Sequence, residues 1–287
     1  MMHFGSGFVG STCPPKWINE RSETSRERAT SHRMSEIYGL ARHPLKRLPR
    51  IATARSSQIL RRCMGSVLHV CTDTPSIALT FDDGPDPNIT PRVLDILRRF
   101  RAQATFFMMG EAARQHPELV QMVHQAGHCV GNHSWDHRKF PALSRLERFD
   151  QMQKTELILQ PYSRKLFRPP FGDQSIASRF DAFCLGLEVI GWSAHGYDWC
   201  EPDPYAMCEA LMQRVFPGSI VLLHARLYEQ ELHRCPGSRE SIVINREPML
   251  KALELFLHQI SGRYSLVTVP NLIQLGTPYR AFWFHKA

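Results

Sequence analysis

Two adjacent carboxylates are the first residues whose type and spacing point to chemistry. Asp82 and Asp83 follow the apolar segment 76–81 (SIALTF) and precede Gly84 and Pro85, a turn-forming pair. Neighbouring carboxylates at a strand end repel each other, and a divalent cation offsets the repulsion by binding one and leaving the other free as a base. The segment TFDDGP alone fits an ordinary turn with solvated acids equally well.

A pair of histidines follows the third predicted strand, in the segment HSWDH. His133 and His137 are four positions apart, which on a helix would place both imidazoles on one face, where they could bind one metal ion. An HxxxH pair alone is weak evidence for a metal site. Asp136 between them is interpreted as a capping residue, with a role behind a metal ligand as the alternative.

An arginine and a stiff proline turn form the third segment, FRPPFG, at residues 167–172. Arg168 could orient a carboxylate through two parallel hydrogen bonds. The backbone N–H groups that follow could face a developing oxyanion. The simpler alternative is a surface arginine followed by a loop.

Two further segments, 192–199 (WSAHGYDW) and 219–224 (SIVLLH), contain a potential acid pair. His224 ends an apolar strand, where most histidines have only a structural role at the edge of the sheet. Beside a carboxylate, however, an imidazole can stay protonated and act as a general acid. Asp198 is the candidate for that carboxylate.

Together the five segments resemble the motifs of the polysaccharide deacetylase family, which is the NodB-homology domain of carbohydrate esterase family 4. The resemblance extends over about residues 70–275 and is carried by TFDDGP, GHCVGNHSWDH, FRPPFG, WSAHGYDW and SIVLLH. It implies a metal-dependent hydrolase that removes N-linked acetyl groups from N-acetylglucosamine units of an oligo- or polysaccharide, releasing acetate.

The resemblance also implies which residues act at the metal. Asp82 matches the family's catalytic base, and the metal ligands match Asp83, His133 and His137. Zinc is the first expectation for this ligand set, with cobalt, nickel or iron as alternatives.

Other implied roles concern the base, the oxyanion and the leaving amine. By the resemblance, Arg168 orients the base and Phe171 supplies a backbone N–H to the oxyanion. Asp198 tunes His224, which is the general acid.

The acetyl pocket is implied to be lined by Leu222 and Trp199. The sequence departs from the family at two places, because His195 and Ala225 stand where members often have aspartate. Neither position is a direct participant, so we expect activity to be retained and the local hydrogen-bond network to differ.

Several substrates and two other protein classes remain as alternatives. Chitooligosaccharides are favoured, because the segments around WSA, DW and SIVLLH look closest to nodulation-type deacetylases. One alternative is an acetyl ester, such as acetylated xylan. Peptidoglycan and amino-sugar glycolipids are further alternative substrates. Two histidines and one carboxylate also form the facial triad of iron oxygenases. A carbohydrate-binding protein that has lost the chemistry is the non-enzymatic alternative.

The elements that must position these residues alternate between short apolar strands and amphipathic helices. Strands are predicted at 76–81, 104–108, 128–131, 166–168, 188–192, 219–224 and 265–269. Helices are predicted at about 90–100, 111–125, 144–160, 173–185, 204–215 and 247–260. The charged connection 226–246 is expected to shape the substrate groove.

This alternation predicts an α/β fold, a single distorted (β/α) barrel of about seven parallel strands, similar to a TIM barrel. The barrel is favoured because the reactive residues all follow strand carboxyl ends, where the active sites of such barrels assemble. A doubly wound open sheet is the alternative, although no GxGxxG follows the first strand.

The net charge of +8 on the 287 residues is concentrated near the amino terminus. Residues 1–75 hold 12 Lys/Arg and 5 Asp/Glu, whereas the rest of the chain holds 23 and 22. We predict a basic, mostly disordered arm at residues 1–65, which could contact anionic surfaces, and a catalytic domain at residues 66–287. No nucleic-acid partner is expected for the nearly neutral catalytic domain.

Location is predicted from the amino-terminal sequence and the cysteines. No run approaches 18 apolar residues, so no transmembrane segment is expected. The first residues lack the basic and apolar regions of a signal peptide, and the eight cysteines contain no CxxC pair. This pattern predicts a cytoplasmic protein, with secretion by a non-standard route as the alternative.

Overall fold

The computed structural model describes residues 60–61, 63–227 and 245–282, which belong to one compact unit within residues 59–287. Most of the predicted amino-terminal arm and of the connection 226–246 lies outside the described residues. The proposals for both segments therefore stay predictions.

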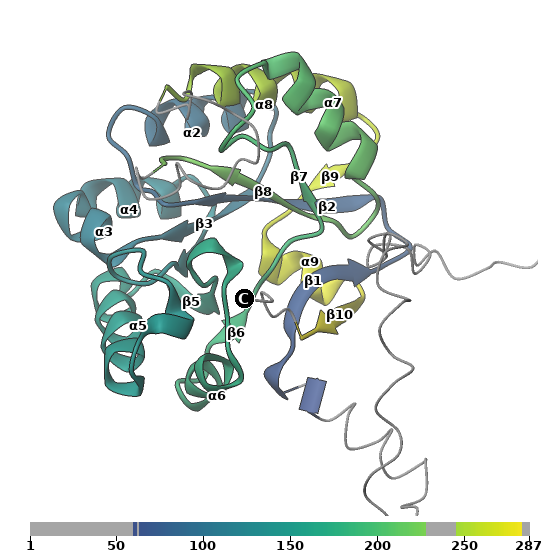
Figure 1. The fold of residues 1–287 in the computed structure, drawn as a ribbon. Helices are drawn as coiled ribbons and strands as arrows, with labels where there is room; N and C mark the ends of the chain where they lie inside the picture. The colour runs from purple at the N-terminus through teal and green to yellow at the C-terminus, as the bar shows by residue number, and fades with distance from the viewer. Residues whose placement is uncertain (1–59, 62, 228–244, 283–287) are drawn as a thin grey trace, which may run out of the picture. The chain divides into compact units, whose positions relative to one another are not determined.

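Parallel strands form a curled sheet (Figure 1), with seven strands in one continuous order and an eighth, β9, beside β2. Their order across the sheet is β6-β5-β4-β3-β2-β8-β7, and β9 pairs with β2. The strands are β2 (Ser76–Asp82), β3 (Ala104–Met108), β4 (Cys129–Asn132), β5 (Ser163–Phe167), β6 (Glu188–Val189), β7 (Ala194–His195), β8 (Ile220–His224) and β9 (Ser265–Leu266). Within the described residues no ladder joins β6 to β7. The predicted barrel-like α/β fold is confirmed, as a half-barrel that is open between these two strands.

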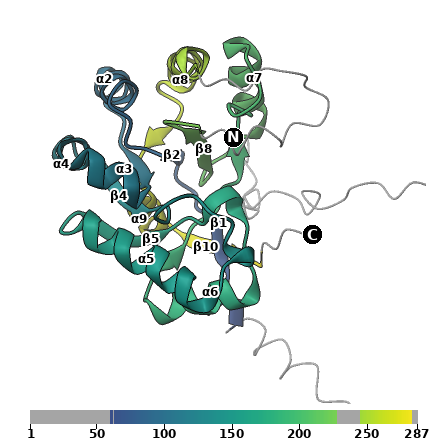
Figure 2. The ribbon, with the colours of Figure 1, turned by 60° about the vertical axis from the view of Figure 1, so that its left-hand side comes forward.

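Helices cover the outer face of this sheet (Figures 1 and 2). They are α2 (Thr90–Arg99), α3 (Gly110–Gln115), α4 (Pro117–Gln125), α5 (Arg145–Leu159), α6 (Ile176–Cys184), α7 (Pro204–Arg214) and α8 (Glu247–Ile260). Successive side chains of a strand point to opposite faces. On β2, Ile77, Leu79 and Phe81 therefore pack against the helices, whereas Thr80 and Asp82 face the inner side.

The inner side is filled by elements that the sequence analysis did not predict. The antiparallel pair of β1 (Ser66–Cys71) and β10 (Thr277–Ala281) lies there with the short helix α9 (Val269–Gln274). Val67, Val269 and Leu272 pack against Ala78 and Ile220, near the amino-terminal ends of β2 and β8. The apolar inner core thus occupies one end of the barrel, and the carboxyl ends of the strands remain for polar side chains.

The predicted continuous helix over 111–125 is wrong, because α3 ends at Gln115 and α4 begins at Pro117. Proline lacks the N–H that an uninterrupted helix would use, and it disfavours the helical conformation of the residue before it. His116 accordingly has φ −132° and ψ 60°. None of the helices in the described part of the chain is long and apolar enough to cross a membrane.

Candidate active site

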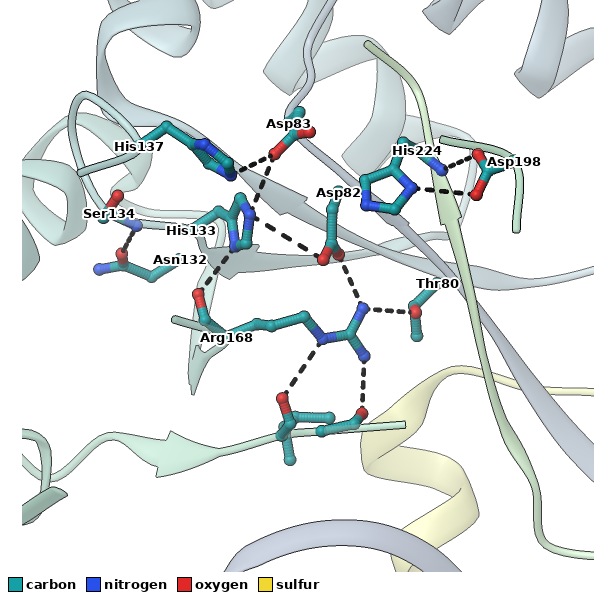
Figure 3. A network of polar contacts seen from close by, with 12 residues as sticks. Thr80, Asp82, Asp83, Asn132, His133, Ser134, His137, Arg168, Asp198 and His224 are labelled. Atoms are coloured by element: carbon teal, nitrogen blue, oxygen red, sulfur yellow. Dashed lines mark hydrogen bonds and ion pairs between the residues drawn. The ribbon is translucent and has the colours of Figure 1, made fainter. Parts of the chain in front are cut away.

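The carboxyl ends of the parallel strands bring the predicted residues together, as Figure 3 shows. A cavity of about 60 Å³ is lined by Asp82, His133, His137, Phe171, Gly172, Trp192, Trp199, Leu222 and His224. The other three predicted residues, Asp83, Arg168 and Asp198, are fully buried behind this lining. A larger groove of about 430 Å³ lies between α2 and α8 and contains none of the predicted residues.

Asp83, His133 and His137 form a cluster that fits a metal ion. Asp83 Oδ1 lies 3.0 Å from His133 Nε2 and 3.1 Å from His137 Nε2, and one potential ligand atom from each residue lies within 4.8 Å of the others. Neither oxygen of the buried Asp83 carboxylate has a hydrogen-bond partner of good geometry. A buried carboxylate left this way is costly, and a bound cation would satisfy it.

The charge state of Asp83 suits this purpose. Burial alone raises the pKa of Asp83, but His137 and His133 together outweigh burial and hold that pKa well below its usual range. The carboxyl group is therefore ionised, which is the form that binds a cation.

A hydrogen bond selects the tautomer of His133. Its Nδ1 donates to the main-chain oxygen of Arg168 at 2.8 Å, because a carbonyl can only accept. The lone pair is consequently on Nε2, which faces Asp83. Ligand histidines in metal sites are held in this way by a partner on their second nitrogen.

The two histidines are not on a helix, so they do not share a helical face as their four-residue spacing would allow. Residues 133–137 form a turn in which Ser134 and His137 have φ of 67° and 60°. The N–H of Ser134 donates to Asn132 Oδ1 at 2.9 Å, and the next two main-chain N–H groups donate to Gln151 Oε1 on α5. Side chains of flanking elements thus replace the helical hydrogen bonds that the spacing suggested.

Arg168 holds Asp82. Its Nη1 donates to Asp82 Oδ1 and to Thr80 Oγ1, both at 2.7 Å. Its Nε and Nη2 donate to the carbonyls of Ile190 and Gly191. The contact with Asp82 is therefore a single hydrogen bond rather than the predicted parallel pair, because the other donors hold main chain. The second oxygen of Asp82 lies 3.9 Å from His133 Nε2.

On the other side of Asp82 in Figure 3 lies the pair of His224 and Asp198. His224 Nδ1 donates to Asp198 Oδ1 at 3.0 Å, and the His224 N–H donates to Asp198 Oδ2 at 2.8 Å. Burial opposes ionisation of Asp198, but His224 and Arg246 outweigh it and lower the pKa of that carboxyl. Arg246 is a member of this group that the sequence analysis missed.

The turn after β5 places Phe171 at the cavity. Phe171 and Gly172 have φ of 61° and 68°, and the ring of Phe171 lies 4.5 Å from the ring of His137. A Cβ on residue 172 would lie 2.7 Å from Trp192 Cη2. Both the left-handed conformation and this close approach require glycine there.

His195, where family members often have aspartate, is uncharged at neutral pH. Burial lowers the pKa of His195 to about 4, and its ring packs 5.1 Å from the ring of Trp199. Trp199 in turn meets the ring of His224 edge to face at 5.6 Å. Trp199, which lines the cavity, thus contacts both His224 and the uncharged ring of His195. Ala225, the second departure, uses its main-chain N–H to bond the Asp82 carbonyl at 2.9 Å.

Comparisons with known proteins agree with the fold described above. The family model described as polysaccharide deacetylase matches residues 69–190. A peptidoglycan-N-acetylglucosamine deacetylase of Bacillus cereus is 35% identical over 202 residues, which are 69% of this chain and 68% of that protein. A chitooligosaccharide deacetylase of Sinorhizobium fredii is 34% identical over 187 residues, 63% of this chain and 87% of that protein.

A solved structure shows the same fold. It is a crystal structure of a peptidoglycan N-acetylglucosamine deacetylase in complex with 4-naphthalen-1-yl-N-oxidanyl-benzamide, with a TM-score of 0.65 at 27% identity. The match covers 77% of this chain and 98% of that one. The chain belongs to the polysaccharide deacetylase family.

Proposed function

We propose that this chain is a metal-dependent deacetylase that removes N-linked acetyl groups from N-acetylglucosamine units, with chitooligosaccharides as the favoured substrates and acetate as the product. One observation carries the proposal. Asp82, held by Arg168, borders the same small cavity as two histidines of an Asp–His–His cluster and, on its other side, His224. Hydrolysis of an amide needs a base, an electrophile and an acid in this kind of proximity.

Asp83, His133 and His137 would hold the cation, for which zinc suits the ligand types. A zinc ion bound there would polarise the acetyl carbonyl and lower the pKa of a bound water.

Asp82 is the proposed base that takes the proton from the attacking water. Its Oδ1 accepts from Arg168 at 2.7 Å, and its second oxygen lies on the His133 side. The Arg168 main-chain oxygen meanwhile orients His133. One buried arginine thus sets the positions of both the base and a metal ligand.

His224 is the proposed acid that gives a proton to the departing sugar nitrogen. An amine anion is a poor leaving group, so cleavage of an amide needs this proton. Asp198 accepts from His224 Nδ1, which orients the imidazole, and His224 lines the cavity. Trp199 and Leu222 are proposed to contact the acetyl methyl group, and the Phe171 N–H is proposed to face the oxyanion.

Peptidoglycan is the second candidate substrate, because a peptidoglycan deacetylase is among the relatives with 35% identity. The iron-oxygenase alternative is disfavoured, since facial triads usually sit on antiparallel barrels whereas these ligands follow parallel strands. Acetyl esters and simple carbohydrate binding remain as outcomes of the test. The cytoplasmic location stays a prediction from the amino-terminal sequence.

The test is acetate release by the purified chain from N-acetylchitooligosaccharides, peptidoglycan fragments and acetylated xylan. We expect the highest kcat/KM with chitooligosaccharides, loss of activity after treatment with a chelator, and recovery when zinc is added. Binding of oligosaccharide by zinc-loaded protein without acetate release from any substrate would support the non-enzymatic alternative. Preference for xylan acetate would support the esterase.

A further inference from the structure

Arg246 is a buried cation that touches both members of the proposed acid pair. It is 3% exposed and directly precedes α8. Its Nη1 donates to the Asp198 main-chain oxygen at 2.8 Å. Its Nη2 donates to the His224 main-chain oxygen at 2.9 Å and also pairs with Asp198 Oδ2. A single guanidinium therefore bridges the loop that carries Asp198 and the end of the strand that carries His224.

Asp198, His224 and Arg246 hold one another through a shared set of hydrogen bonds. Asp198 Oδ1 accepts from the His224 ring, and Oδ2 accepts from the His224 N–H and from Arg246. The His224 main chain is held at its N–H by Asp198 and at its oxygen by Arg246. The carboxylate plane and the strand end are thus fixed relative to each other, and the ring of His224 is aligned by both.

We propose that Arg246 is a positioning residue for proton donation, which keeps Asp198 and His224 aligned so that the His224 ring can serve the leaving group. The inference rests on the proposed function. Arginine suits this position because its planar fork presents several donors in fixed directions, whereas lysine presents one nitrogen. Removing Arg246 would take one of the two donors from Asp198 Oδ2 and would also remove the Arg246 donors from the main-chain oxygens of Asp198 and His224.

A merely structural role and a positioning role differ in how they depend on the leaving group. The amine of an N-acetyl sugar needs a proton as it departs, whereas the 4-nitrophenolate of 4-nitrophenyl acetate leaves without one. Misplacing the acid should therefore slow amide cleavage and spare the activated ester, if base and metal ligands are intact. A general loss of structure would slow both reactions equally.

The experiment measures kcat/KM of the zinc-loaded full chain for an N-acetylchitooligosaccharide and for 4-nitrophenyl acetate, in wild type, Arg246→Gln and Arg246→Lys. The ratio of the two values does not depend on how much of a preparation is folded. For Arg246→Gln we expect the amide-to-ester ratio to fall by about 100-fold, at the lower end of what general acid catalysis contributes. Arg246→Lys should recover part of the loss, and zinc content should be unchanged in both.

Arg92→Gln is the matched control. Arg92 pairs with Glu247, the residue next to Arg246, and its side chain is 49% exposed. This variant should keep the wild-type ratio. An unchanged ratio in Arg246→Gln, with active wild type, would overturn the inference alone. A wild-type chain that releases no acetate from any N-acetyl sugar would overturn the proposed function, and the inference with it.

Discussion

At the scale of single residues, each group proposed to act is held by a second residue. Arg168 fixes Asp82 through its side chain and His133 through its main chain. Asp198 holds both the ring and the N–H of His224. These partners supply the hydrogen bonds that buried polar groups need. Asp83 is different, because Oδ1 of its buried carboxylate lies beside two imidazole nitrogens, and this is the position proposed for the cation.

The metal cluster leads to a first prediction. His133→Ala should lose zinc, with affinity falling by more than the roughly 10–100-fold that removal of an outer partner costs, because a direct ligand is gone. Zinc content after dialysis against a weak chelator is the measurement. Asp136→Ala is the control from the same turn, since its carboxylate pairs with exposed Arg138 and not with the cluster. Equal zinc contents in the two variants would remove His133 from the proposed ligand set.

Residue types and spacing were enough to predict that these side chains gather around one cavity, because strand carboxyl ends meet at one end of a parallel barrel; Gly172 and Trp192, which also line it, were not predicted. They could not reveal the conformation that carries His133 and His137. The four-residue spacing fits one helical turn, but here Asn132 and Gln151 hold a different turn. Arg246 was missed because a lone arginine before a helix looks the same whether it is buried or solvated.

At the scale of elements, the loops after the strands share an unusual backbone feature. Asp83, Ser134, His137, Phe171 and Tyr197 all have φ between 60° and 69°, and each follows a strand of the curled sheet. Residues other than glycine avoid this region, at a cost on the order of 1 kcal/mol or more each. Such conformations persist when surrounding contacts determine them. Two of these five residues, His137 and Phe171, line the cavity.

The buried His128 leads to a prediction about how stability depends on pH. His128 precedes β4, and its Nδ1 accepts from the Ala104 N–H at 3.2 Å. Burial lowers the pKa of His128 from 6.5 to about 4. Below about pH 6.5 the unfolded chain therefore binds a proton at His128 that the folded chain does not bind. The contribution of neutral His128 to the free energy of unfolding is fully present above that pH and is lost as the pH falls toward 4. Between pH 7 and pH 5 this costs roughly 2 kcal/mol.

The measurement is urea unfolding of the metal-free protein at pH 7 and pH 5, with chelator present so that metal release does not contribute. His128→Gln cannot titrate, and its unfolding free energy should fall less over this interval than that of the wild type, by the amount stated above. Parallel falls in the two proteins would show that His128 does not contribute to the pH dependence.

Apolar patterning predicted the central elements well and the peripheral ones poorly. Residues 76–81 and 104–108 are buried on both faces, so their continuous apolar runs match β2 and β3. Strand β10 is at most half-buried and reads TPYRA, which carries no strand pattern. Its partner β1 lies about 200 residues earlier in the chain, a distance over which local sequence cannot predict pairing. Strand β7 has only two residues, too few for any periodicity.

At the scale of the whole molecule, the family and the α/β half-barrel are established, while the substrate is a proposal. The cavity is small, about 60 Å³, and its lining includes Phe171, Trp192 and Trp199, with the uncharged His195 ring packed against Trp199. These features suit an acetyl group on an uncharged sugar. The predicted division into a basic arm and a catalytic domain stays a prediction, because residues 1–59 are outside the described residues.

The proposed deacetylation depends most on Asp82 acting as a base beside a cation that other residues hold. The most direct measurement is the rate of acetate release from an N-acetylchitooligosaccharide by zinc-loaded Asp82→Asn compared with wild type. Asparagine keeps the shape of the side chain and can still accept from Arg168, but it cannot take a proton from water. We predict unchanged zinc content and a kcat lower by about 100- to 10,000-fold. A kcat near the wild-type value, with zinc bound, would contradict the account.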